Sequence, residues 1–222
     1  NDVKDNRMDA YAFVNATIHV DFQTTIENAT LLIKEGIIQQ VGSGISTPKG
    51  YTTIDATGKH LYPSFIEMYS SYGLPKLDKS PGFNWGAAEK IAPVVKGAYN
   101  ANDAIKSYHN AATTFSIKND AAKELRAIGF GTTSSFRKDG IARGTSVLAT
   151  LANTSDNQVI INEKTAAYYS FDKGSSKQNF PSSLMGSIAL LRQTYMDASW
   201  YKSAKTFTDL SLDSWISQQS LP

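Results

Sequence analysis

The sequence contains no cysteine, three histidines, seven prolines and only 19% charged residues. The absence of cysteine excludes disulfides, thiolate zinc sites and cysteine nucleophiles together. No apolar run approaches the roughly 18 residues that a bilayer span requires, so the sequence argues against a membrane span. Neither a glycine-rich phosphate loop nor a G-x-S-x-G motif is present, which leaves nucleotide hydrolysis and serine-esterase chemistry without support.

The remaining composition is that of an ordinary globular protein. The 222 residues are 41% hydrophobic and 11% aromatic, enough for one large domain or two small ones. Lysine and arginine total 22 against 20 acidic residues, without a concentrated basic stripe, so nucleic acid is not an expected partner. The sequence begins at Asn1 and not at methionine; we expect that a preceding segment has been removed, which favours a periplasmic or secreted location.

Hydrophobic patterning predicts an α/β protein. Short β-rich segments between residues 11 and 55, separated by turn residues, predict a β meander. A helix is expected over 119–129, with Asn119 as its N-cap, followed directly by a strand. The longest predicted helix is 182–205, whose apolar residues recur at helical spacing. Further strands are expected at 63–69, 130–136, 146–151, 158–162 and 166–171.

Five segments occur in the order in which similar ones are found in metal-dependent amidohydrolases. They are Asn15–Thr17, Ile26–Gly36, Ile38–Gly42, Ile54–Lys59 and Pro63–Ser71. Residues 140–146 and 183–195 are similar to a subgroup of large bacterial amidohydrolase-related proteins. The chain therefore resembles the N-terminal part of a bacterial amidohydrolase-family protein over most of its length.

The resemblance implies a small β-sandwich over residues 1–62 that leads into a (β/α)₈ barrel beginning at residue 63. Residues 63–222 are too few for a barrel of about 250 residues. We therefore expect an incomplete barrel, and hence an N-terminal fragment of a hydrolase acting on carbon–nitrogen bonds. Its expected partner is the remainder of its own polypeptide or an oligomer mate, with a small-molecule substrate.

The metal chemistry of the family is not matched in this chain. The family carries a His-x-His pair at the end of the first barrel strand, since residues two apart on a strand face the same side. Here the matching positions are Tyr69 and Ser71, which are poor zinc ligands. We expect no metal and no catalytic residue in this chain, and zinc only in its parent. Glu67 is either a lone carboxylate ligand or a hydrogen-bonding group of the interior.

Arg143, with Asp139 nearby, is the candidate for binding an anionic substrate group at the barrel mouth. The alternative is a salt bridge from Arg143 to Asp139 or another carboxylate. His19, His60 and His109 are far apart in the sequence and are expected to be surface or packed residues and not metal ligands.

Aromatic pairs later in the chain either line a pocket or pack in the core; they are Tyr168, Tyr169, Trp200 and Tyr201. Two further functions remain open beside the hydrolase segment. One is a non-catalytic, amidohydrolase-like scaffold or binding module. The other is a plain β-sandwich binding module with a helical appendage.

Overall fold

The computed structural model describes residues 9–77, 88–204 and 206–222. The chain divides into two compact units, Asn1–Ser64 and Phe65–Pro222, which we describe separately. No helix in the described residues is long and apolar enough to cross a membrane.

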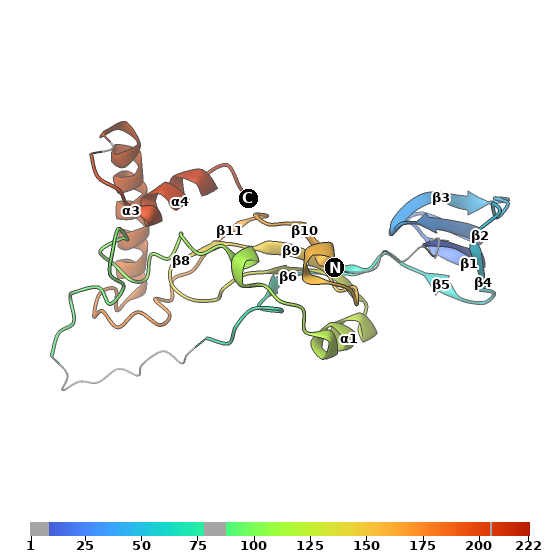
Figure 1. Cartoon of the computed structure of the whole chain (residues 1–222), viewed down its shortest axis with the longest axis horizontal. Coiled ribbons are helices and arrows are strands. Elements are labelled where there is room, and N and C mark those ends of the chain that lie inside the picture. Colours follow the sequence, from blue (N-terminus) through green and yellow to red (C-terminus); the bar gives the residue numbers. More distant parts are fainter. Residues whose placement is uncertain (1–8, 78–87, 205) are drawn as a thin grey trace. The chain divides into compact units, whose positions relative to one another are not determined.

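The first unit is a five-stranded sheet (Figure 1). Strands β1 (Ala10–His19), β2 (Thr25–Lys34) and β3 (Ile37–Ser43) pair antiparallel in sequence order, which confirms the predicted meander. Strands β4 (Thr52–Asp55) and β5 (His60–Leu61) both pair in parallel with β1. The resemblance implies a small β-sandwich, whereas the described residues of this unit form one continuous sheet.

A tight hairpin and a small core hold this sheet together. Glu35 and Gly36 join β2 to β3 with φ angles of +52° and +75°, the two positive values that a two-residue type I′ turn requires. Its buried apolar residues are mostly alanine, so the sheet buries little volume: Ala10, Ala12, Ala16, Ile18, Ala29, Leu32 and Ala56.

The second unit contains a four-stranded sheet in the order β10, β9, β7, β6. Strands β6 (Phe65–Ser70) and β7 (Phe130–Ser135) are parallel, and the segment between them contains the 3₁₀ helix η1 (Ala111–Thr114) and α1 (Asn119–Ala127). Adjacent barrel strands pair in this way. Strand β9 (Val147–Thr150) pairs antiparallel with β7 and with β10 (Ile160–Asn162). The helical turn α2 (Asp156–Val159) directly precedes β10. A separate pair joins β8 (Ala142–Thr145) to β11 (Ala167–Tyr169).

The predicted helix at 119–129 is confirmed, but its predicted N-cap is wrong. Lys118 has the extended backbone of the cap position, and its side chain makes no capping hydrogen bond. Asn119 is already the first helical residue. The carboxylate of Asp156 instead accepts a hydrogen bond from the backbone N–H of Ile117, at 2.7 Å, just before the helix. The side chain that accepts a backbone N–H at the start of α1 therefore comes from Asp156, which is distant in the sequence, and not from the local residue Asn119.

Helix α3 (Leu184–Ala204) packs against α4 (Leu210–Gln218), a helix that the sequence patterning does not predict. The buried positions of α3 are Ser187, Leu190, Thr194, Ala198 and Tyr201. The side chains that recur at helical spacing lie mainly on the exposed side: Leu184, Ile188, Tyr195 and Met196 are 58%, 40%, 61% and 60% exposed. Small residues let α3 approach its neighbours closely, so the strongly apolar face is not the buried one.

Glycine lets the loop before and within β8 approach the segment 104–110. Gly144 has a φ of +81°, and a Cβ atom there would clash with the carbonyl oxygen of His109. The backbone N–H of Thr145 donates to that same oxygen at 3.0 Å. The close approach is therefore part of the strand pairing and cannot relax without breaking it.

We predict that Gly144→Ala destabilises the second unit by about 3 kcal/mol or more, because a strained φ of about 1–3 kcal/mol is added to a backbone clash. Gly97→Ala is the matched control: its φ is +115°, but the added Cβ meets only ordinary contacts with Tyr99 at 3.5 Å. Urea unfolding followed by tryptophan fluorescence measures both variants, since every tryptophan lies after residue 64. Equal losses in the two variants would contradict the steric argument.

Candidate functional site

The carboxyl ends of β6 and β7 meet because the two strands are parallel, and the candidate site lies there. Tyr69 is near the end of β6, and Arg143 is carried by β8 after the loop that leaves β7. Nη1 of Arg143 donates to the Tyr69 hydroxyl at 3.0 Å, and its Nε donates to the carbonyl of Gly140 at 3.1 Å. Arg143 is only 8% exposed, so a buried guanidinium is brought to a phenol 74 residues away.

Stacked aromatic rings fix the position of Tyr69. Its ring meets the fully buried Phe136 edge-on at 5.1 Å, and Phe136 stacks on Tyr168 at 3.6 Å with an 11° interplanar angle. The Tyr168 hydroxyl donates to the carbonyl of Met68 at 2.6 Å, which ties β11 to β6. Tyr168 thus lies at the site, whereas Tyr201 is a core residue at 1% exposure.

A second cation, Lys138, also lies against Tyr69. Its Nζ donates to the Tyr69 carbonyl at 2.6 Å and lies 4.1 Å from the centre of the Tyr69 ring. A lysine over a tyrosine face is an attractive cation–π geometry. Two positively charged side chains therefore approach one tyrosine from its backbone side and its hydroxyl side.

Asp139 is bound by other partners than Arg143. Its Oδ2 lies 2.6 Å from Nζ of Lys106, and both of its oxygens accept hydrogen bonds from Ser175, at 2.7 Å from the N–H and 2.9 Å from the hydroxyl. Burial alone raises the pKa of Asp139, but the bonds from Lys106 and Ser175 outweigh it and hold that pKa below its usual value. The predicted alternative of an Arg143–Asp139 salt bridge does not occur among the described residues; Asp139 positions the loop, and its contact with substrate stays a prediction.

The surroundings of Tyr69 do not suit a divalent metal ion. Its neutral phenol already accepts a hydrogen bond from a guanidinium, with the Lys138 ammonium nearby, and a cation there would meet like charge. The Glu67 carboxylate accepts from the backbone N–H of Tyr69 at 2.8 Å. Within residues 9–77, 88–204 and 206–222 no group of three or more His, Cys, Asp or Glu side chains could hold a metal. We derive no metal-dependent step from these residues.

The histidines do not join this site. His19 and His60 lie on the sheet of the first unit, where Nε2 of one is 3.0 Å from Nδ1 of the other. His109 lies in the second unit, where burial and the positive charges of Arg137 and Lys106 lower its pKa to about 4, against the opposing effect of Asp139. His109 is therefore neutral at physiological pH.

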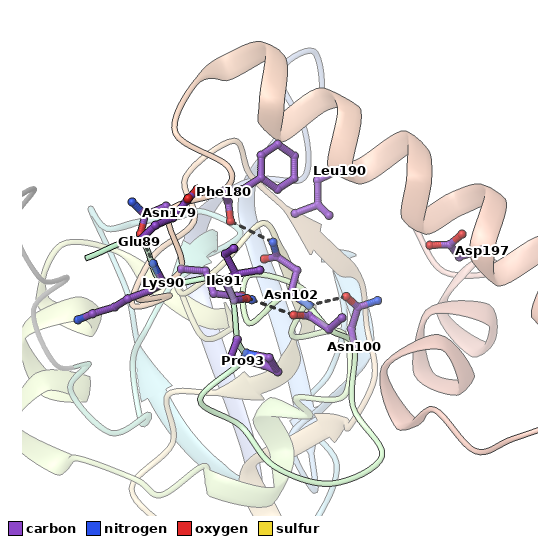
Figure 2. Close-up of a pocket in the computed structure, with 13 residues that line it drawn as sticks. Glu89, Lys90, Ile91, Pro93, Asn100, Asn102, Asn179, Phe180, Leu190 and Asp197 are labelled. Atoms are coloured by element: carbon purple, nitrogen blue, oxygen red, sulfur yellow. Dashed lines mark hydrogen bonds between the residues drawn. The ribbon is translucent and has the colours of Figure 1, made fainter. Parts of the chain in front are cut away.

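A cleft of about 520 Å³ lies between three loops and α3 of the second unit (Figure 2). Its side-chain amides are largely used to hold the loops together. Asn102 donates to the carbonyl of Phe180 at 3.0 Å, and Gln178 donates to the carbonyls of Ile91 and Ala101 at 2.6 and 2.9 Å. Asp197 faces the cleft from the helix. These hydrogen bonds hold the loops around the cleft in place, but they also use the amide N–H groups that could otherwise bind a ligand.

A larger groove of about 820 Å³ adjoins the candidate site. Its lining includes Ser71, three lysines and a single carboxylate: Lys76, Lys118 and Lys138, with Glu124. Its other lining residues are mainly apolar. The groove is therefore positively charged and shares Lys138 with the cluster around Tyr69.

The sequence patterning misses several residues of this cluster. Lys138 lies two residues after the predicted strand at 130–136, and that position near a strand end is the signal that identifies it. Lys106 and Ser175 carry no comparable signal, because their roles depend on contacts with Asp139 across 33 and 36 residues. The sequence names Tyr168 as an aromatic residue of a pocket or core, but not its contact with Met68 across 100 residues.

Comparisons with known proteins find a similarity in sequence and a similarity in fold. No family model matches the chain. A dihydroorotase from Trichlorobacter lovleyi is 30% identical over 87 residues, which are 35% of this chain and 20% of that enzyme. The crystal structure of an amidohydrolase from Thermotoga maritima superposes with a TM-score of 0.67 at 21% identity, over 92% of this chain and 54% of that chain.

The predicted resemblance to the N-terminal part of an amidohydrolase-family protein is confirmed by these two matches. The structural match shows the fold: a mixed α/β arrangement shared with the Thermotoga protein. The chain spans about half the length of that protein, and the matched segment is a fifth of the dihydroorotase.

We predict that the stability of the second unit falls between pH 6.5 and pH 4 because of His109. The unfolded chain takes up a proton on this histidine below pH 6.5, whereas the folded chain takes it up only near pH 4, so acid favours unfolding within that window. The loss is up to about 3 kcal/mol. His109→Gln should flatten this part of the profile, measured by urea unfolding at each pH; an unchanged slope in the variant would contradict the assignment.

Proposed function

We propose that the chain is the N-terminal segment of an amidohydrolase-like hydrolase acting on carbon–nitrogen bonds, and that this segment is not catalytic by itself. The observation that carries the proposal is the fold match over 92% of the chain to the Thermotoga amidohydrolase. The sequence match to a dihydroorotase over 87 residues also supports an enzyme as the parent. In this proposal the parallel strands β6 and β7 begin a barrel that the rest of the parent completes, and zinc binds outside this chain.

A second function is favoured by the chemistry around Tyr69. The positions proposed to match the family's His-x-His pair are Tyr69 and Ser71, and Tyr69 lies between the charges of Arg143 and Lys138. Such a site supports a non-catalytic, amidohydrolase-like scaffold or binding module. Arg143 and Asp139 remain the proposed contacts for an anionic substrate group in either case.

Hydrolysis by the longer polypeptide that contains this chain tests the first proposal. We expect the parent to hydrolyse members of a panel of cyclic and linear amides and to contain zinc by elemental analysis, and the 222-residue chain alone to do neither. A parent that is inactive and metal-free would favour the scaffold. One equivalent of zinc held tightly by the chain alone would overturn the assignment of Tyr69 and Ser71 as non-ligands.

The exposed apolar side chains of the second unit support the remainder of the parent as a partner. Strand β6 exposes Phe65, Ile66 and Met68 at 65%, 58% and 69%, and α3 exposes Met185 and Trp200 at 79% and 54%. Apolar surface of this extent is normally covered. The Thermotoga protein, which shares the fold, has a further 46% of its length outside the match.

We predict that the chain expressed alone oligomerises or aggregates, and that co-expression with the rest of its parent gives a soluble complex. Replacing Ile66 and Met68 by serine should shift the isolated chain toward monomer by removing exposed apolar area at the sheet edge. The same change at the exposed Ile161 on β10 is a control for general solubility. A monomeric, cooperatively unfolding wild-type chain in size-exclusion chromatography would refute the need for a partner.

A further inference from the structure

We propose that Tyr69, Lys138 and Arg143 form a binding site for a small oxyanion, a carboxylate or phosphate group, at the carboxyl ends of β6 and β7. The proposal rests on the anion contact proposed above for Arg143 and deepens it, but it requires neither a metal nor a reaction. It rests on the contacts of three side chains in the second unit.

The first observation is a buried positive charge without a carboxylate partner. Arg143 is 8% exposed, and its hydrogen bonds in the described part of the chain go to neutral oxygens, those of Gly140 and Tyr69. Burying a guanidinium is costly unless a negative charge compensates it. The nearest carboxylate in sequence, Asp139, is committed to Lys106.

The second observation is the direction of the donors. Because the Tyr69 oxygen accepts from Arg143, its own proton is available to donate to another acceptor. The guanidinium carries five N–H donors, and two of them, one on Nε and one on Nη1, donate to protein oxygens. The planar fork of an arginine is the usual partner of a carboxylate or phosphate. Tyr69 is 57% exposed, which leaves its side of the site open to a ligand.

The third observation is an excess of positive charge around the site. Four cationic side chains and two carboxylates lie around the site: Lys106, Arg137, Lys138 and Arg143, with Asp139 and with Glu67, whose carboxylate accepts from the backbone N–H of Tyr69. The pKa of His109 is lowered first by burial and then by the charges of Arg137 and Lys106, so these two cations also act on a neighbouring segment. The groove that shares Lys138 adds Lys76 and Lys118. A small anion gains from this field, whereas a metal ion is repelled.

Titration calorimetry on the full 222-residue chain, in the oligomeric state in which it purifies, tests the site. The probes are inorganic phosphate and succinate, with chloride at matched ionic strength as the non-specific arm. We expect saturable binding of at least one oxyanion and none of chloride. Tighter phosphate binding would assign a phosphate ligand, and tighter succinate binding would assign a carboxylate ligand; failure of both probes to bind above chloride would overturn the proposal.

Three variants locate the binding. Tyr69→Phe keeps the ring under Lys138 and removes the hydroxyl, and should weaken binding about tenfold. Lys138→Gln should weaken it by a smaller factor, and Arg143→Gln should weaken it about 100-fold or more. Lys164→Gln, an exposed lysine on the loop after β10, removes the same charge away from the site and should leave binding unchanged.

If Arg143→Gln does not fold, Tyr69→Phe and Lys138→Gln still test the site, because both of these side chains are at least partly exposed. Binding that is unaffected by both of these variants, or weakened equally by Lys164→Gln, would overturn the site. The outcome is separable from that of the hydrolase proposal: an inactive parent leaves the binding result standing, and an absence of binding leaves parent hydrolysis untouched.

Discussion

The buried ion pair between Lys106 and Asp139 is the interaction on which the polar centre of the second unit depends. It joins three segments that are far apart in the sequence, because Ser175 donates both its N–H and its hydroxyl to the same carboxylate. Backbone bonds reinforce it: the N–H groups of Ile141 and Ala142 both donate to the carbonyl of Ala104. A buried ion pair repays its desolvation only when the remaining oxygens and protons are satisfied, and Asp139 meets that condition. Its main effect is therefore to select one loop arrangement.

This commitment of Asp139 determines the chemistry around Arg143. Were Asp139 free, the guanidinium four residues later would have a carboxylate within reach and the cluster would be nearly neutral. Because Lys106 takes that carboxylate, Arg143 turns to the hydroxyl of Tyr69, and Lys138 adds a second charge on the other side of the same residue. The local charge is then set by a residue on a different segment. The structural ion pair between Lys106 and Asp139 thus leaves Arg143 with a neutral hydrogen-bond acceptor in place of a carboxylate.

Much of the fold follows from local patterning, and the site does not. Alternation and turn residues predict the meander and the strands at β6 and β7, and propensity predicts α1, because these depend on neighbours in sequence. The buried face of α3 is misread, since periodicity counts large apolar residues whereas three of the buried positions are small or polar: Ser187, Thr194 and Ala198. The Arg143–Tyr69 contact joins residues 74 apart and exists only because β6 and β7 are parallel. Arg143 was identifiable as a charge in a glycine-flanked loop; its partner was not.

The difference between a metal site and the site around Tyr69 extends beyond the identity of one strand residue. Two imidazoles at positions 69 and 71 would still lie beside the guanidinium of Arg143 and the ammonium of Lys138, which repel a divalent ion and compete for the same lone pairs. The phenol at position 69 suits this setting, because it is neutral, accepts from a cation and can still donate a proton. Lys138 and Arg143 are held in turn by the loop that Asp139 anchors. Tyr69 is therefore one part of a consistent electrostatic arrangement, in which strand pairing, loop anchoring and side-chain chemistry all favour negative charge at the same point.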